Sequence, residues 1–218
     1  MVAWHGGREC VVVDPAFYTD GERDEFLSFL DGSGLVPAAI LITHAHFDHI
    51  FGVAELQRRF GVPVHMDNRE LPVLEYNTEM AARLGLHAPD NSFTFTDALE
   101  GERIAAAGFE FEVISTPGHA PGAVCYLDRS EKLMFSGDTL FAGTIGRTDL
   151  MYSDYDQEIR NIMEKLIVLD PDIRFYPGHG PSSTIGRERT HNPFLEPFNE
   201  PEEIQDPDAE PIIINGLR

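Results

Sequence analysis

The sequence has little cysteine, little basic charge and no long apolar run. Two cysteines in 218 residues, Cys10 and Cys125, exclude a disulfide framework and favour a reduced, cytoplasmic setting, with a single bridge between them left open. Sixteen Lys and Arg against 37 Asp and Glu give a formal charge of −21, which repels phosphate backbones and disfavours a nucleic-acid partner. The longest apolar runs, such as 38–42 and 212–214, fall far short of the roughly 20 residues of a membrane helix, so no membrane span is expected.

The length fits one globular domain, because a single hydrophobic core serves about 200 to 250 residues. We expect this domain to span residues 1–195. The C-terminal segment differs in composition, since positions 196–211 hold seven acids, four prolines and no basic residue. Such a composition cannot bury a core on its own. Residues 196–218 are therefore predicted to form an acidic, proline-rich tail.

Short apolar runs alternate with amphipathic stretches, which favours an α/β fold. Strands are expected at 10–14, 38–42, 62–66, 109–114, 123–127, 133–135 and 173–176. Helices are expected at 22–30, 50–60 and 184–192, and a further helix is expected to begin near residue 153 and to stop before Pro171. Ser153 and Asp156 have the spacing of a capping box at the start of that helix.

A dense group of candidate metal ligands follows the strand expected at 38–42: Thr43-His44-Ala45-His46-Phe47-Asp48-His49. An HxHxDH pattern should occur by chance about once in ten thousand chains of this length. His44 and His46 can project to the same side of an extended loop, while Asp48 and His49 can turn toward a neighbouring position. One short loop, fixed between a strand and a helix, can thus supply ligands to two metal ions.

Three further candidate ligands, His119, Asp138 and His179, each follow a glycine at the end of a strand-like run. Strands that end together would gather these residues at one edge of a sheet. Zinc and similar cations take imidazole and carboxylate ligands, and a carboxylate can bridge two ions about 3.5 to 4 Å apart. The total of five His and two Asp suits two metal sites.

The motif His44-x-His46-x-Asp48-His49, followed in order by His119, Asp138 and His179, resembles the metallo-β-lactamase superfamily over about residues 10–195. The resemblance implies an αβ/βα four-layer sandwich and a hydrolytic site with two zinc ions per chain, or iron or manganese in their place. It implies two ligand sets that share Asp138 as a bridge: His44, His46 and His119 for the first ion, and Asp48, His49 and His179 for the second. Asp14 matches the family's early aspartate, which orients the ligand loop.

Three stretches, 137–141, 146–150 and 178–184, resemble single-domain bacterial glyoxalase II-like (hydroxyacylglutathione hydrolase-like) enzymes. The implied reaction is hydrolysis of a small-molecule acyl thioester by a hydroxide that bridges the metal ions, with Asp48 and Asp138 as the catalytic carboxylates. A thiolate has a pKa near 8.5 and leaves without a strong general acid. Long glyoxalase II enzymes carry Lys and Tyr for glutathione where this chain has Arg147 and Asp149, so glutathione is left open as the thiol.

Two residues are candidates for substrate contact. Arg147 can bind a substrate carboxylate through its planar guanidinium, with an ion pair to Asp149 as the alternative. His87 lies in a loop, 85–90, that could border the site.

The alternative function is that of a mononuclear iron persulfide dioxygenase on the same fold. His44, His119 and Asp138 would then form a two-His, one-carboxylate iron site. Members of that group share the Gly-Arg-Thr-Asp stretch that begins here at Gly146.

Overall fold

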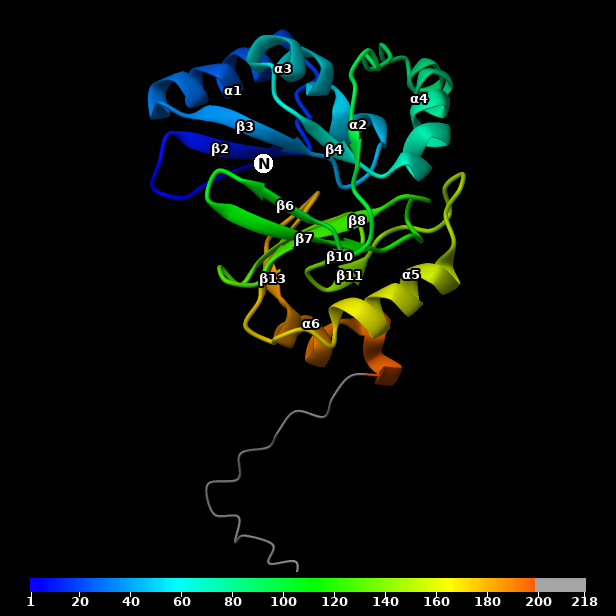
Figure 1. Ribbon diagram of the computed structural model, residues 1–218. Helices are drawn as coiled ribbons and strands as arrows, with labels where there is room; N and C mark the ends of the chain where they lie inside the picture. Colours follow the sequence, from blue (N-terminus) through cyan, green and yellow to red (C-terminus); the bar gives the residue numbers. More distant parts are fainter. Residues whose placement is uncertain (199–218) are drawn as a thin grey trace, which may run out of the picture.

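The computed structural model describes residues 1–198 and places two β-sheets between two layers of helices (Figure 1). The first sheet has the order β1 (Val2–Trp4), β2 (Glu9–Val13), β3 (Val36–Leu41), β4 (Val64–Met66) and β5 (Thr96–Asp97). The second has the order β13 (Ser183–Thr184), β12 (Arg174–Pro177), β9 (Leu133–Gly137), β8 (Val124–Asp128), β7 (Phe109–Ser115) and β6 (Arg103–Ala106). β10 (Leu140–Phe141) and β11 (Thr144–Ile145) form a separate hairpin.

The helices divide between the two outer faces (Figure 1). The first sheet is covered by α1 (Asp20–Ser33), α2 (Phe47–Ile50), α3 (Val53–Phe60) and α4 (Leu71–Arg83), which the short 3-10 helix η1 (Asn68–Glu70) precedes. The second sheet is covered by α5 (Tyr155–Asn161), the π-helical turn η2 (Ile162–Leu166) and α6 (Ile185–His191). The predicted αβ/βα four-layer sandwich is thus confirmed.

Side chains alternate between the two faces of each buried strand, and this alternation produces the apolar layers between the two sheets and between each sheet and its helices. In β2, Cys10 and Val12 pack in the cluster beneath α1 and α3, whereas Val11 and Val13 pack in the cluster between the sheets. In β8, Tyr126 belongs to the cluster between the sheets, and the residues on either side of it pack beneath η2 and α6. Because both faces are buried, these strands read as continuous apolar runs.

Strand direction brings four loops together. β9 and β12 are parallel, and β7 runs the same way, because both β7 and β9 are antiparallel to β8. The carboxyl ends of β7, β9 and β12 therefore lie at one edge of the second sheet. At that edge the amide of Val124, which begins β8, donates to the carbonyl of Thr43, 2.9 Å away and just beyond β3. The loop after β3 in the first sheet thus joins the same edge.

The helix predicted over 50–60 is wrong as a single element, because α2 and α3 are separated at Phe51 and Gly52. Gly52 lies against the ring of Phe17, where an added Cβ would come within 2.4 Å of Cζ. Its amide also donates to the carbonyl of Pro15 at 2.8 Å. This close contact with an earlier segment interrupts the helix, although the apolar periodicity continues across it.

The capping box predicted at Ser153 is also wrong. α5 begins one residue later, after Asp154, whose carboxylate accepts from the amide of Gln157 at 3.0 Å. The hydroxyl of Ser153 instead donates to the carbonyl of Leu150 at 2.8 Å. Ser153 and Asp154 can both cap a helix, but the hydroxyl of Ser153 is hydrogen-bonded within the preceding loop, so Asp154 is the N-cap.

At the C-terminal end, α6 confirms the helix predicted over 184–192, with Thr184 as its N-cap. The 3-10 helix η3 (Pro193–Phe198) crosses the predicted boundary at residue 195. The rest of the predicted tail, 199–218, lies outside the described residues. Within residues 1–198, no helix has the length and apolar character needed to cross a membrane.

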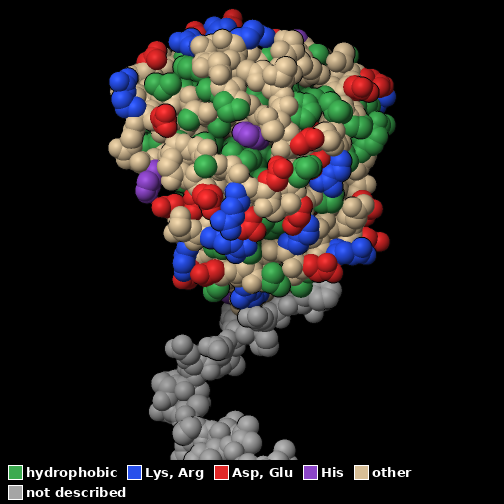
Figure 2. Space-filling view, viewed as in Figure 1, with side chains coloured by type: hydrophobic (Ala, Val, Ile, Leu, Met, Phe, Trp, Pro, Cys, Tyr) green, Lys and Arg blue, Asp and Glu red, His purple; other side chains and the backbone are tan. Residues whose placement is uncertain are grey.

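The two cysteines are both unpaired and buried, in different layers. The bridge left open from the sequence is therefore absent. On the surface, acidic and basic side chains lie intermixed over the face drawn in Figure 2. Ion pairs of the described residues include Arg129 with Glu112 at 2.7 Å and Arg103 with Glu110.

Candidate metal centre

All seven predicted ligands lie at the edge where β3, β7, β9 and β12 end. The loop after β3 carries His44 and His46, and α2, into which it leads, carries Asp48 and His49. The loops after β7, β9 and β12 carry one ligand each. Three groups have all their ligand atoms within 4.8 Å of one another: His44, His46 and His119; His44, His49 and Asp138; and Asp48, His49 and His179. The structure thus brings together residues that span positions 44 to 179.

Asp138 lies between the two predicted ligand sets. Its Oδ2 is 3.7 Å from Nε2 of His119 and 3.6 Å from Nε2 of His179. Its Oδ1 is 3.5 Å from Nε2 of His49. One carboxylate therefore contacts histidines from both sets, as the bridging role expected for it requires.

Hydrogen bonds outside the centre orient two of the histidines. Nδ1 of His119 lies 2.8 Å from the carbonyl of Arg147, so it carries the proton and donates, and Nε2 faces the centre. Nδ1 of His49 lies 3.1 Å from a carboxylate oxygen of Asp14 and is fixed in the same way. Both rings therefore direct Nε2 toward Asp138, and a hydrogen bond from Nδ1 that fixes the ring in this way is the arrangement that metal-ligating histidines use.

Asp14 ties the ligand loop to the end of β2. Its carboxylate accepts from the amide of Thr43 at 2.8 Å and from the Thr43 hydroxyl at 2.7 Å, in addition to His49. Its backbone φ of 46° is left-handed, a conformation that Asp adopts more readily than most residues. These contacts are those expected of a side chain that orients the loop.

The electrostatics favour neutral imidazoles in the first set. Burial, reinforced by neighbouring imidazoles, holds the pKa of His44 well below its usual range and lowers the pKa of His46 to about 3. Burial also lowers the pKa of His119. For His49, burial acts in the same direction, but the contacts with Asp138 and Asp14 outweigh it and raise the pKa to about 10. Neutral imidazole nitrogens have the lone pairs that a cation needs.

The residues present fit a metal ion. Among the described residues, His44 Nε2, His49 Nε2 and Asp138 Oδ1 are buried atoms without a hydrogen-bond partner, and the three residues form one of the ligand groups. An unsatisfied buried polar group costs about 1 to 3 kcal/mol, and bound cations would satisfy these atoms. Imidazole nitrogen and carboxylate oxygen are suitable ligands for zinc, iron and manganese.

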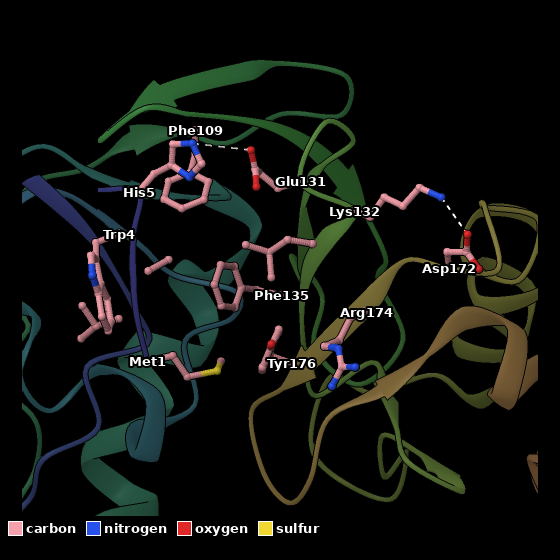
Figure 3. Close-up of a pocket in the computed structure, with 13 residues that line it drawn as sticks. Met1, Trp4, His5, Phe109, Glu131, Lys132, Phe135, Asp172, Arg174 and Tyr176 are labelled. Carbon is pink, nitrogen blue, oxygen red and sulfur yellow. Dashed lines mark hydrogen bonds and ion pairs between the residues drawn. The ribbon is translucent and has the colours of Figure 1, made fainter. Parts of the chain in front are cut away.

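A cavity of about 390 Å³ opens against the ligands. Its lining includes His119, Asp138 and His179 from the centre, and Phe141, Ile145 and Arg147 from the adjoining loop and hairpin. A larger cavity, of about 720 Å³, lies elsewhere and is lined by Trp4, Phe109, Phe135 and Tyr176 among others (Figure 3). None of the seven ligands lines that larger cavity, so the smaller one is the candidate substrate site.

The two predicted substrate contacts occupy different positions. Arg147 lines the smaller cavity, and its guanidinium forms two hydrogen bonds with Asp149, at 2.7 and 2.9 Å, which is the ion pair expected as the alternative. His87 stacks on the ring of Tyr18 with the centroids 4.2 Å apart, and its Nδ1 lies 3.0 Å from the Tyr18 hydroxyl. His87 belongs to none of the ligand groups.

Sequence reasoning missed the buried polar side chains of the helices that support the ligand loops. Glu158 of α5 is buried, and its Oε2 accepts from the amide of His119 at 2.8 Å. Burial raises the pKa of Glu158 to about 8. The available signal was its position one turn before Ile162 on the apolar face of the helix. Glu70 and Asn77 give no such signal.

Both the sequence and the fold match known proteins. Residues 1–179 match the family model described as Metallo-beta-lactamase superfamily. Hydroxyacylglutathione hydrolase GloC of Haemophilus influenzae is 36% identical over 198 residues, which cover 88% of this chain and 90% of that protein. Two crystal structures, of the BLEG-1 B3 metallo-beta-lactamase and of TTHA1623 in a di-iron-bound form, each give a TM-score of 0.80 at 37% identity. Both matches cover 89% of this chain, and 92% and 93% of those chains respectively.

The chain belongs to the metallo-β-lactamase superfamily. Within that superfamily it is a metal-dependent hydrolase, and the resemblance stated from its motifs is confirmed.

Proposed function

We propose that this protein hydrolyses acyl thioesters at a centre of two metal ions. The observation that carries the proposal is the position of Asp138, whose two oxygens face histidines of both ligand sets. The ions would be held as follows: His44, His46 and His119 for the first, Asp48, His49 and His179 for the second, and Asp138 between them. Zinc is the metal we propose, with iron or manganese as alternatives. The di-iron-bound form of TTHA1623 supports iron as an alternative.

When bound, the metal ions would supply an activated nucleophile, because divalent cations lower the pKa of bound water from about 15.7 to about 7 and polarise a carbonyl oxygen. Two carboxylates of the protein, Asp48 and Asp138, are the candidates to accept the proton of the attacking water. Asp48 keeps 42% of its side chain exposed, and its Oδ2 lies 3.2 Å from Nε2 of His179. Asp138 is held ionised, since contact with His49 and neighbouring imidazoles lowers its pKa although burial acts to raise it. Each carboxylate can accept the proton that the attacking water releases.

The cavity beside the ligands suits a small acyl thioester. Its volume of about 390 Å³ is within the range of small-molecule sites, about 300 to 1,000 Å³. Phe141 and Ile145 give it an apolar wall, and Arg147 lines it with a guanidinium that is paired with Asp149. None of the described residues that line it is Lys, Tyr or Cys. The absence of a strong proton donor there favours a leaving group that departs as an anion, which a thiolate does.

The relative in Haemophilus influenzae is named a hydroxyacylglutathione hydrolase, which supports a thioester as the substrate class. The test is to load the purified protein with zinc and to measure thiol release from S-lactoylglutathione and from a panel of other acyl thioesters. We expect turnover with at least one of them, and a loss of at least about 100-fold in Asp138→Asn and His119→Ala.

Protein that holds two zinc ions and cleaves no thioester of the panel would refute the proposal. One iron per chain, with oxygen consumption on glutathione persulfide, would select the dioxygenase instead. The metal content of protein purified without added metal distinguishes the two before any substrate is tried.

A further inference from the structure

The residue between the first two histidines is held on both sides by buried side chains. The amide of Ala45 donates to Oε2 of Glu70 at 2.6 Å, and the carbonyl of Ala45 accepts from Nδ2 of Asn77 at 2.7 Å. Glu70 ends η1 and Asn77 lies in the middle of α4. The N–H and the C=O of this residue are therefore both fixed by groups outside the loop.

Glu70 also reaches the second ligand loop. Its other oxygen, Oε1, accepts from the amide of Gly122 at 2.6 Å, and Gly122 lies three residues after His119. The contact is close, because an added Cβ at Gly122 would lie 3.0 Å from Cγ of Glu70. One carboxylate thus links the loop after β3 to the loop after β7.

These bonds are sheltered from water. Glu70 and Ala45 are both fully buried, and Asn77 is 2% exposed. Hydrogen bonds to an ionised carboxylate are shorter and roughly twice as strong as neutral ones. A loop has no strand ladder to fix its amides, so side-chain acceptors of this kind set its conformation.

We propose that Glu70 and Asn77 are positioning residues that set the His44–His46 pair against His119 and thereby determine the metal affinity of the first site. The proposal rests on the ligand assignment made above, not on the substrate. Nδ1 of His46 and Nε2 of His119 lie 2.9 Å apart across the site. Metal–nitrogen distances are held within about 0.2 Å, so a small shift of either loop changes the coordination.

The hydrogen-bond pattern makes the isosteric variants informative. Both oxygens of Glu70 accept from backbone N–H groups, whereas the amide of Glu70→Gln accepts through one atom and turns an NH₂ group toward the other N–H. Asn77→Asp places a carboxylate oxygen against the carbonyl of Ala45. Each variant keeps the volume of the side chain and reverses one contact.

The matched control is Asp128→Asn. Asp128 is 1% exposed and accepts from the amides of Glu110 and Ser130, each at 2.9 Å. It ends β8, at the opposite end of that strand from Val124 and the ligand loops. It is therefore a buried carboxylate of the same kind that holds no ligand loop.

Three measurements test the proposal at pH 8, above the pKa of Glu70, which burial raises to about 7. They are zinc affinity by competition with a chromophoric chelator, the visible absorption spectrum of the cobalt-loaded protein, and the thermal midpoint of the metal-free protein. We expect Glu70→Gln and Asn77→Asp to weaken, about 10- to 100-fold, the zinc site that His44→Ala abolishes, and to alter the cobalt spectrum. Asp128→Asn should lower the thermal midpoint and leave affinity and spectrum unchanged.

His44→Ala separates the proposal from its premise. If His44→Ala loses one of the two zinc sites while Glu70→Gln and Asn77→Asp keep wild-type affinity and spectrum, the positioning role is refuted and the ligand assignment stands. If His44→Ala keeps both zinc sites at wild-type affinity, the assignment fails and the positioning role fails with it. Should Glu70→Gln not fold, Glu70→Asp is the substitute. It keeps both acceptor oxygens on a side chain that is one methylene shorter, and its zinc affinity is expected to lie below that of the wild type and above that of His44→Ala. Wild-type affinity in Glu70→Asp would count against the proposal.

Discussion

The backbone of Gly178 lies so close to two proposed ligands that one added methyl group should disable the centre. A Cβ at this position would lie 2.2 Å from Oδ1 of Asp138 and 2.5 Å from Cε1 of His49. The φ of Gly178 is not in the left-handed region, so Gly178→Ala introduces a collision without backbone strain. The side chains of Asp138 and His49 are both largely buried, and each would have to move by about 1 Å to restore an ordinary van der Waals separation from the added Cβ.

The expected effect on the centre is much larger than the effect on the fold. Overpacking of this kind costs about 1 to 3 kcal/mol of stability, which corresponds to roughly 2 to 12 °C in the thermal midpoint of a domain this size. A displacement of about 1 Å at reacting groups costs about 100-fold in rate, and it exceeds the tolerance of metal–ligand distances. Gly178→Ala should therefore lose bound metal and at least about 100-fold in thioester turnover while remaining folded.

The assay combines metal content by mass spectrometry, turnover of the best thioester and thermal unfolding. Gly32→Ala is the control: Gly32 lies in α1, has no heavy atom within 4 Å of the added Cβ and has no left-handed φ. It should keep full metal content and gain about 0.5 to 1 kcal/mol of stability, because alanine favours a helix over glycine. Gly178→Ala that binds two ions with wild-type affinity would refute the assignment of Asp138 and His49 as ligands.

Three further predictions follow from the same contacts. Asp14→Asn removes an acceptor from a carboxylate that serves Thr43 and His49, so zinc titration should show the second site weakened about 10- to 100-fold; unchanged affinity would exclude an orienting role. Burial raises the pKa of Cys10 to about 11 and of Cys125 to about 12, so at pH 8 the native protein should react with a thiol reagent far more slowly than the unfolded chain, which should titrate two thiols. Rapid labelling of native protein would contradict that burial. Removal of metal by a chelator should lower the thermal midpoint by roughly 5 to 10 °C, since a ligand at 100 times its dissociation constant stabilises by about 2.7 kcal/mol; calorimetry that shows no shift would argue against a metal site.

The convergence of the candidate ligands was predictable because glycines and candidate ligand residues follow apolar runs in the sequence. The candidate ligands lie in the segments that follow four strands, and these strands are buried on both faces, so they stand out as apolar runs. His119, Asp138 and His179 each follow a glycine, and in the case of His179 that glycine lies against the centre itself. The order of strands within the sheets was not predictable in this way, since pairing between distant strands leaves no local mark.

What the sequence could not reveal depends on contacts between distant segments. The break between α2 and α3 arises from Phe17, some 35 positions before Gly52, whereas a glycine in a helical pattern is by itself compatible with an unbroken helix. The start of α5 was misplaced by one residue because Ser153 and Asp154 are both good caps, and the carbonyl of Leu150 decides between them. η1 and α4 escaped prediction entirely, and with them the side chains that hold Ala45.

The positions of three buried carboxylates explain why such irregular loops can hold a metal centre. Asp14 comes from the end of β2, Glu70 from η1 and Glu158 from α5, so they approach the loops from different layers of the sandwich. Each accepts an amide of a ligand loop: that of Thr43, those of Ala45 and Gly122, and that of His119, respectively. Loop amides that find no partner in a strand must be satisfied elsewhere, and a buried carboxylate is itself tolerable only when such donors surround it. For Asp14 and Glu70 the two requirements are met by the same bonds, whereas Glu158 accepts from the amide of His119 and its Oε1 has no hydrogen-bond partner. The position of the ligand loops is consequently fixed by the packing of the helices as well as by the sheets.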